Sequence, residues 1–232
     1  MKKNLIFTAT YNEIENIGKL IKKINQLSKN VDILIIDDNS PDGTGLLVKK
    51  LKKKYSNLKL IERVKKSGLN TAHQIGFRYA KKNNYKKLIT MDADLSHNPK
   101  EIPKILKLLD KNEFVIGSRY MKGGKCEMKL HRLVLSIIGN KIIKFILNIN
   151  SDEFTSSYRG FNLEKLKRFD LKYIKSKGYS FFMESVFLIN SLNYKILQIP
   201  ITFSNRKHGQ SKIPKDEIFR TLKNLFILKY LK

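Results

Sequence analysis

Two acidic side chains separated by a single residue give this sequence its first chemical signal. Asp92 and Asp94 directly follow the apolar run Leu88–Met91, which has the length and composition of a buried strand. At strand spacing the two carboxylates point to the same side. Because close anions repel, a site that keeps both ionised usually holds a cation, and Mg²⁺ or Mn²⁺ completes its shell with water and phosphate oxygens. The pattern predicts a metal site; a surface loop with a capping Asp is the alternative.

A second acidic pair follows another apolar run. Asp37 and Asp38 come after Ile33–Ile36 and precede Pro41-Asp42-Gly43. Carboxylates at such a strand end can accept hydrogen bonds from ribose hydroxyls or from the edge of a base. The segment is also an ordinary turn signature, so a turn and a binding role are both predicted here.

Arginines form a third group of candidate residues. Only 8 of the 47 basic residues are Arg, and guanidinium is the group that grips phosphate with two parallel hydrogen bonds. Arg119 follows the run Phe114–Ile116, Arg132 opens a long apolar stretch, and Arg206 and Lys212 lie close together near the C-terminus. A phosphate-binding role and a simple surface charge are the two interpretations of each.

The elements that must position these residues alternate along the chain. Short apolar runs predict buried strands, and apolar residues at intervals of three or four between them predict helices. The predicted strands are Asn4–Thr8, Ile33–Ile36, Leu58–Ile61, Leu88–Met91 and Phe114–Ile116, and the helices cover Ile14–Leu27 (with Asn12 as N-cap), Leu46–Tyr55 and Ala72–Ala80. This order predicts an α/β fold, a mostly parallel central sheet with helices on both faces, in which ligands bind at the carboxyl ends of the strands.

The composition of the chain indicates which kinds of molecule it could bind. The chain has 232 residues, 41% hydrophobic and 29% charged, and a formal net charge of +27. That charge favours an anionic partner, such as nucleic acid, anionic lipid or a phosphorylated substrate, although an AT-rich genome would also produce a Lys-rich chain. Cys126 is the only cysteine, which excludes an intramolecular disulfide. The apolar stretch Leu133–Ile149 contains polar and charged residues and is not expected to span a membrane.

Taken in order along the chain, several segments resemble one enzyme family. They are Thr10–Glu13, Asp37–Thr44, Met91–His97, Gly117–Gly124, Gly178–Glu184, Ile199–Phe203 and Gly209–Lys212. Each is weak alone, but the ordered set is similar to the dolichyl-phosphate mannose synthase type of inverting glycosyltransferase, in glycosyltransferase family 2, with a GT-A type nucleotide-diphospho-sugar transferase fold. The resemblance implies a catalytic domain over residues 1–213 and a C-terminal amphipathic helix over residues 214–232, without a transmembrane domain.

The resemblance also implies roles for individual residues. Those expected to hold the nucleoside of the donor are Thr10, Tyr11, Asn12, Glu13, Asp37 and Asp38. Asp92 and Asp94 would hold Mg²⁺ or Mn²⁺ on the diphosphate. Those expected around the donor and acceptor phosphates are Arg119, Arg132, Ser136, Arg206 and Lys212, and Glu184 is grouped with the substrate-binding residues.

The implied reaction moves mannose or glucose, from GDP-mannose or UDP-glucose, to polyprenyl or dolichyl phosphate. A lipid phosphate is already anionic and needs no general base. The implied place of action is the inner face of the cytoplasmic membrane, where an anionic surface would bind the protein peripherally; nucleic acid is not an expected partner. One alternative is transfer to a sugar hydroxyl, with Glu184 as the candidate general base. Nucleic-acid binding rests on charge alone, and an inactive membrane scaffold would not need Asp92 and Asp94.

Three departures from the family pattern affect the sugar and the acceptor. Ala9-Thr10 replaces the usual proline, and Ser96 stands where many members have a Gln metal ligand. The usual Asp-x-Thr-Ser-Gly-Phe-Arg reads Asp152 to Arg159 here, with Ser157 for Gly and an open register for Asp152.

Overall fold

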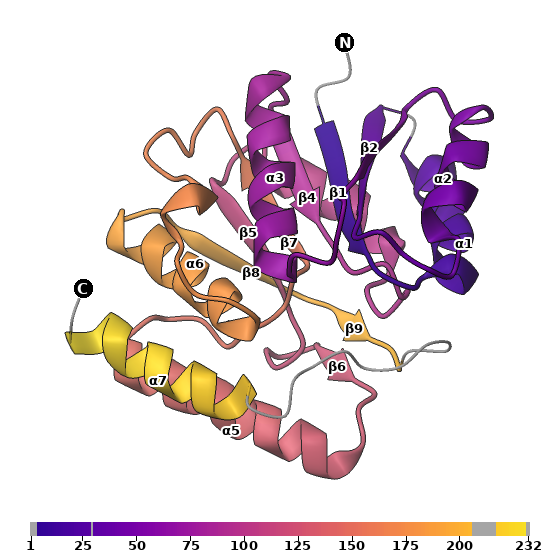
Figure 1. Ribbon diagram of the computed structural model, residues 1–232. Coiled ribbons are helices and arrows are strands. Elements are labelled where there is room, and N and C mark those ends of the chain that lie inside the picture. Colours follow the sequence, from indigo (N-terminus) through magenta and orange to yellow (C-terminus); the bar gives the residue numbers. More distant parts are fainter. Residues whose placement is uncertain (1–3, 29, 206–216, 231–232) are drawn as a thin grey trace.

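The computed structural model describes residues 4–28, 30–205 and 217–230. A seven-stranded sheet forms its centre (Figure 1). The strands of that sheet are β1 (Asn4–Thr10), β2 (Val31–Asp37), β3 (Leu58–Glu62), β4 (Lys87–Thr90), β5 (Phe114–Ser118), β7 (Arg159–Asn162) and β8 (Ile196–Pro200). A second, two-stranded sheet pairs β6 (Lys125–Cys126) with β9 (Thr202–Phe203).

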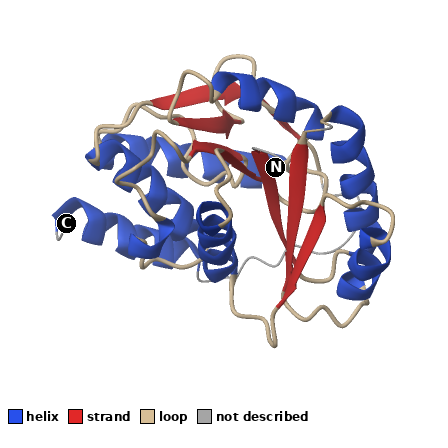
Figure 2. Cartoon of the chain, turned by 90° about the horizontal axis from the view of Figure 1, so that it is seen from above, coloured by secondary structure: helices blue, strands red, loops and turns tan. Residues whose placement is uncertain are grey.

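Helices fill the connections between these strands. The α-helices are α1 (Ile14–Leu27), α2 (Thr44–Lys52), α3 (Leu69–Lys82), α4 (Ile102–Leu108), α5 (Leu130–Leu147), α6 (Tyr179–Ser191) and α7 (Glu217–Tyr230), and the 3-10 helices are η1 (Pro99–Glu101) and η2 (Leu171–Tyr173). Seen from above, helices flank the strands on both sides (Figure 2). The predicted α/β class and the five predicted strands are therefore confirmed.

The strand order fixes where a ligand can bind. It runs β3-β2-β1-β4-β7-β5-β8, and all pairs are parallel except those made by β7. The chain builds outward from β1 to β3 and then crosses to place β4 on the other side of β1. At such a switch point the loops leaving neighbouring strands diverge and open a crevice at their carboxyl ends. Thr10 and Asp37 end β1 and β2 there, and Asp92 lies in the loop that leaves β4.

Alternation along β1 divides the core into two layers. Leu5 and Phe7 belong to a cluster with α3, α5, α6 and α7, whereas Ile6 belongs to a second cluster with α1, α2 and α4. Both clusters are fully buried at the sheet, because β1 is covered on both faces.

Helix boundaries differ from the sequence prediction by a few residues, and α3 covers Leu69–Lys82 where Ala72–Ala80 was predicted. Asn12 is not the N-cap of α1: its φ is +56° and Glu13 takes the cap position without a side-chain cap. The first amides of α1 are satisfied from the loop after β2, because Glu13 N–H donates to Thr44 Oγ1 (2.9 Å) and Ile14 N–H donates to Asp42 Oδ2 (3.1 Å). Helix α2 ends at Lys52 and does not reach Tyr55.

The C-terminal helix packs on the domain. Helix α7 lies alongside α5 (Figure 1), contacts α5 and α6, and buries Leu225 and Leu228. The predicted boundary between residues 213 and 214 lies outside the described residues. Within the part of the chain that the structure describes, no helix combines the length and apolarity needed to cross a bilayer.

Candidate active site

The two carboxylates after β4 are held by hydroxyl groups from different segments. Strand β4 ends at Thr90, so Asp92 and Asp94 lie in the bend beyond it and strand alternation does not place them as the sequence predicted. Asp94 Oδ1 accepts hydrogen bonds from the amide (3.0 Å) and hydroxyl (2.6 Å) of Ser96. Asp92 Oδ1 accepts one from Ser157 Oγ (2.5 Å). Local hydrogen bonding, not strand geometry, brings both acids to this edge of the sheet.

A neutral histidine supports this bend from behind. His97 is buried against the ring of Tyr158 (centroids 5.0 Å apart), and its Nδ1 accepts the Asp92 amide hydrogen (3.1 Å). Burial lowers the pKa of His97 and outweighs the carboxylates of Asp92 and Asp94, which raise it. Because Nδ1 already accepts a hydrogen bond, the 3.7 Å approach of Asp92 Oδ2 is not an ion pair. His97 therefore has a structural role in this bend.

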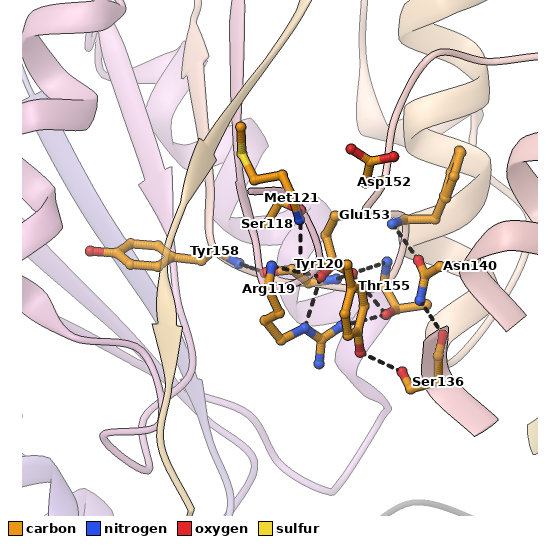
Figure 3. Close-up of polar contacts among 12 residues, drawn as sticks. Ser118, Arg119, Tyr120, Met121, Ser136, Asn140, Asp152, Glu153, Thr155 and Tyr158 are labelled. Atoms are coloured by element: carbon orange, nitrogen blue, oxygen red, sulfur yellow. Dashed lines mark hydrogen bonds and ion pairs between the residues drawn. The ribbon is translucent and has the colours of Figure 1, made fainter. Parts of the chain in front are cut away.

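Arg119 follows β5 and is bound by a carboxylate that sequence reasoning missed. Its Nε and Nη2 donate to the two oxygens of Glu153, each at 2.8 Å, and Nη2 also donates to Thr155 Oγ1 (2.8 Å; Figure 3). Burial alone would lower the pKa of Arg119 and raise that of Glu153. Their mutual attraction and hydrogen bonds outweigh burial, so the pKa of Arg119 is raised and that of Glu153 is lowered. Both groups therefore stay charged at neutral pH.

This pairing also settles the open register of the segment. Glu153, which is fully buried, takes the inward position. Asp152 turns outward and pairs with Lys144 (2.7 Å), while its amide donates to Gln198 (2.8 Å). The signal available in the sequence was the spacing: Glu153, not Asp152, stands two residues before Thr155.

One aromatic ring links the acidic and the basic sides. The guanidinium carbon of Arg119 lies 5.1 Å from the centroid of the Phe203 ring. The same ring meets His97 edge to face (5.5 Å). Strand β9 thus brings the predicted metal residues and the predicted phosphate residue to one place.

A cavity of about 400 Å³ opens on the Arg119 side. Its lining residues are Arg119, Tyr120, Gly124, Cys126, Leu133, Ile137, Asn140, Lys141, Lys144 and Asp152. Among the described residues, no hydrogen bond is made by Arg119 Nη1, so its N–H groups remain as donors for a ligand. Ser136 lies at this side as well, with its hydroxyl 2.6 Å from that of Tyr120 (Figure 3). Arg132 is exposed one helical turn earlier on α5 and does not line the cavity.

The residues predicted to bind the nucleoside lie at the ends of β1 and β2. Their side chains also form hydrogen bonds that hold the loops there in place. Asp37 accepts hydrogen bonds from Thr10 Oγ1 (2.7 Å) and from the amide and hydroxyl of Ser40 (2.9 and 2.6 Å). Asp38 forms a buried ion pair with Arg63 and accepts the Ser67 amide (3.2 Å). A nucleoside role for either carboxylate stays a prediction.

The neighbouring Tyr11–Glu13 segment is held from several sides. The Tyr11 ring has Lys66 Nζ above it, 4.3 Å from the centroid. Asn12 is exposed and its amide donates to Ser40 Oγ (3.0 Å), while buried Glu13 accepts from Asn16 Nδ2 (2.8 Å). Tyr11 is half-buried, and its nucleoside role stays a prediction.

Three other predicted residues lie apart from this cluster or beyond the described chain. Glu184 lies on α6, is buried and accepts the amide of Ser176 (2.9 Å). That position is unfavourable for a general base that must meet an acceptor. Arg206 and Lys212 lie outside the described residues.

A buried arginine holds the segment that carries Glu153 and Ser157. Arg159 donates to the carbonyls of Ser156 (2.6 Å), Phe154 (2.9 Å) and Phe182 (3.0 Å). Burial lowers the pKa of Arg159 to about 9, which still leaves it charged at neutral pH. Sequence reasoning had noted this arginine only as part of a motif.

Comparison with known proteins decides the family. The profile described as "Glycosyl transferase family 2" matches residues 5–169, well over half of the chain. The chain belongs to glycosyl transferase family 2. It is therefore a glycosyltransferase.

Two curated relatives in this family cover most of the chain. It is 34% identical over 215 residues to the polyprenol monophosphomannose synthase of Mycolicibacterium smegmatis, with 91% of this chain and 81% of the relative covered. It is 34% identical over 210 residues to the undecaprenyl-phosphate mannosyltransferase of Micrococcus luteus, with 90% and 86% covered.

Solved structures of low sequence identity share the GT-A type fold. The mannosyltransferase PcManGT from Pyrobaculum calidifontis, solved with GDP-Man and Mn²⁺, has a TM-score of 0.57 at 16% identity, over 85% of this chain and 55% of that one. Glucosyl-3-phosphoglycerate synthase from Mycobacterium tuberculosis, solved with Mn²⁺, UDP and glucosyl-3-phosphoglycerate, has a TM-score of 0.66 at 15% identity, over 98% and 80%.

Proposed function

We propose that this glycosyltransferase moves mannose from GDP-mannose to a polyprenyl phosphate with inversion at the sugar. The observation that carries the proposal is the pair of curated relatives, both named for mannosyl transfer to a polyprenol or its phosphate and both similar over nine-tenths of this chain. The contacts that run from Asp92 through His97 and Phe203 to Arg119 support it. Glucose from UDP-glucose is the second donor to be tested.

The donor set fits a divalent cation, Mg²⁺ or Mn²⁺, at Asp92 and Asp94. Among the described residues, no group of three or more His, Cys, Asp or Glu side chains could hold a metal. Two carboxylates suit a hard cation that takes its remaining ligands from water and from the donor diphosphate. When bound there, the ion would neutralise charge on the leaving nucleotide. Ser96 and Ser157 keep the two carboxylates in place by hydrogen bonds.

The acceptor phosphate belongs on the Arg119 side. Glu153 fixes the orientation of the guanidinium, whose Nη1 can donate to an anionic oxygen in the cavity. Ser136 would add a hydroxyl, and Arg132, Arg206 and Lys212 further positive charge. Because a phosphate monoester is already an anion, attack on the sugar needs no side chain to remove a proton. The buried position of Glu184 disfavours the alternative, transfer to a sugar hydroxyl.

A polyprenyl phosphate resides in a bilayer, so we place the enzyme at a membrane, peripherally on the inner face of the cytoplasmic membrane. The net charge of +27 is suited to an anionic surface.

The test is transfer of label from a panel of GDP- and UDP-sugars into extractable lipid, with Mg²⁺ or Mn²⁺ supplied. Labelled lipid with GDP-mannose, lost on addition of a chelator, is the expected outcome. Transfer only to water-soluble sugars would overturn the acceptor, and transfer only from another donor would overturn the sugar.

A further inference from the structure

Two adjacent helices leave large apolar side chains uncovered. On α5 they are Leu130, Val134, Leu135, Ile138, Ile142 and Phe145, and on α7 they are Phe219, Leu222, Phe226 and Tyr230. Phe145 is 87% exposed and Phe219 is 79% exposed. Most of the exposed large apolar side chains in the described part of the chain lie on these two helices. A monomeric soluble protein seldom leaves such a concentration of apolar surface uncovered unless it binds something.

The spacing puts each set on one helical face. On α5 the exposed residues from Leu130 to Phe145 are three or four residues apart except for the adjacent Val134 and Leu135, which keeps them on one face, while Ile143 and Leu147 on the opposite face are buried. On α7 the intervals from Phe219 to Tyr230 are three, four and four, and the buried face carries Leu225 and Leu228. Each helix therefore packs on the domain with one face and presents a second apolar face outward.

The charges on these helices favour one class of partner. Helix α5 contains no acidic residue and carries Arg132, Lys141 and Lys144; the only acid on α7 is Glu217, which is buried. A second copy of this chain would bring like charges together. An anionic lipid surface attracts them, and its interior accepts the apolar side chains.

The same helix connects this face with the candidate active site. Leu133, Ile137, Lys141 and Lys144 of α5 line the cavity that contains Arg119, while Leu135, Ile138 and Phe145 point away from the core. A bilayer against the outer face of α5 would be separated by this one helix from the cavity that contains Arg119.

We propose that the exposed apolar faces of α5 and α7 are the surface by which this protein docks on an anionic lipid bilayer. Phe145 and Phe226 insert among the lipids, and the basic residues of both helices contact the head groups. The choice of a bilayer rests in part on the proposed function, because the acceptor proposed there is a lipid.

The chain contains no tryptophan, so single substitutions can report insertion. The variants Phe145→Trp and Phe226→Trp are mixed with vesicles of phosphatidylglycerol or of phosphatidylcholine, without nucleotide sugar or acceptor. Leu46→Trp, at a position that is 70% exposed, is the matched control. Leu46 belongs to α2, which lies on the opposite side of the view from α5 and α7 (Figure 1). We expect a blue shift of the emission with phosphatidylglycerol vesicles for the two Phe variants only.

A second measurement asks whether the apolar side chains are needed. Phe145→Glu, a change at an exposed position, should weaken co-sedimentation with these vesicles by about tenfold or more, because it removes the buried area of one Phe. Leu46→Glu should leave it unchanged. Deleting α7 would be a poorer test, since it also uncovers the core around Leu225.

Two outcomes would overturn the proposal. One is unshifted emission of both Phe variants with phosphatidylglycerol; the other is a shift that appears without vesicles as the protein concentration rises, which would mark a dimer interface. Docking is measured without transfer. Insertion without labelled lipid therefore counts against the proposed function alone, and transfer to detergent-solubilised lipid without insertion counts against the docking face alone.

Discussion

At the scale of single residues, the candidate site consists of side chains that are already engaged before any ligand arrives. Asp94 is bound by Ser96, Asp92 by Ser157, and Arg119 by Glu153. Such fixed polar groups need little rearrangement when substrate charge appears next to them. The predictions for single residues therefore distinguish residues that contact the substrate from residues that hold a neighbouring side chain in place.

Replacing Asp94 by Ala should abolish transfer while the protein stays folded. The diphosphate would lose the cation that the proposed site provides, whereas the loop after β4 would lose the hydrogen bonds that Ser96 donates to Asp94. Labelled-lipid formation and thermal unfolding are measured together. Asp110→Ala, which removes an exposed carboxylate paired with Lys87, is the control. Retention of most of the wild-type turnover by Asp94→Ala would remove the metal assignment.

Replacing Glu153 by Gln should be costly in stability and in acceptor binding. Removing one member of a buried ion pair leaves the other charge uncompensated and costs about 3 kcal/mol. Arg119 would also lose one of the charge-assisted hydrogen bonds that fix its orientation at the cavity, so the KM for the lipid acceptor should rise more than kcat falls. Asp152→Asn breaks a half-exposed pair with Lys144 and should cost less than about 1 kcal/mol. Equal effects of the two changes would show that the Glu153–Arg119 pair has no special role.

The Arg119–Glu153 ion pair makes the stability of the protein depend on pH, and the direction of the change follows from the pKa of Glu153. Arg119 lowers the pKa of Glu153 in the folded protein below its ordinary value of 4.5, despite burial, which acts in the opposite direction. The stabilisation is therefore complete above about pH 4.5 and is lost as the pH falls through the folded-state pKa. The stability difference between the wild type and Glu153→Gln should be constant at neutral pH and shrink in acid, as chemical unfolding at several pH values would show.

Arg132 lies outside the cavity and is a candidate contact for the acceptor phosphate. If its guanidinium meets the lipid phosphate, Arg132→Ala should raise the KM for polyprenyl phosphate roughly ten- to a hundredfold, the loss of one charged hydrogen bond. The KM for the nucleotide sugar should hardly change. Arg78→Ala, on α3, is the control. Unchanged acceptor kinetics would leave Arg132 as a surface charge.

At the scale of elements, the sequence predicted strands better than it predicted the segments that complete the site. Alternating apolar runs located five strands because both faces of the sheet are buried. Strand β7 has no comparable run: Arg159 and Gly160 begin it, Ser157 in the preceding loop donates to Asp92, and Arg159 donates to the carbonyl of Phe182. Contacts between distant segments leave no periodicity, so Glu153 and Arg63 were not predicted as partners of Arg119 and Asp38.

Helix α7 is joined to α6 at a position that only glycine fits. Gly178 has φ +61°, and a Cβ there would lie 2.4 Å from the carboxylate of Glu217, which accepts the Tyr179 amide (2.5 Å). We expect Gly178→Ala to lower the free energy of unfolding by about 1–3 kcal/mol. Gly139→Ala, inside α5 with nothing within 4 Å of the added Cβ, should raise it by about 0.5–1 kcal/mol. Denaturant unfolding of the two variants compares them; a neutral Gly178→Ala would show that this junction tolerates a side chain.

At the scale of the whole molecule, the protein combines a sheet whose switch point lies between β1 and β4 with a large positive net charge. The fold class followed from the order of elements alone. The helical face that remains apolar could not be distinguished from a core-packing face in the sequence, because α5 and α7 have apolar residues on both sides.

The net charge of +27 predicts how salt affects binding to vesicles. Basic residues near an anionic surface contribute about 1 kcal/mol each, and this attraction is screened beyond about 10 Å at 0.1 M salt. Insertion of Phe and Leu side chains is far less sensitive to salt. Co-sedimentation with phosphatidylglycerol vesicles should therefore weaken on raising NaCl from about 0.05 to 0.5 M without disappearing. Complete release would mean that charge alone holds the protein.

The two-sided position of α5 has a kinetic consequence. A helix that forms a wall of the cavity with one face and lies in the bilayer with the other keeps Arg119 at a fixed height above the lipids. The enzyme would then sample acceptor only within the leaflet on which it rests, and the relevant quantity would be molecules of polyprenyl phosphate per unit area. Diluting that acceptor with inert lipid, at constant bulk amounts of acceptor and enzyme, should slow transfer, whereas dilution with buffer should not once all the protein is bound.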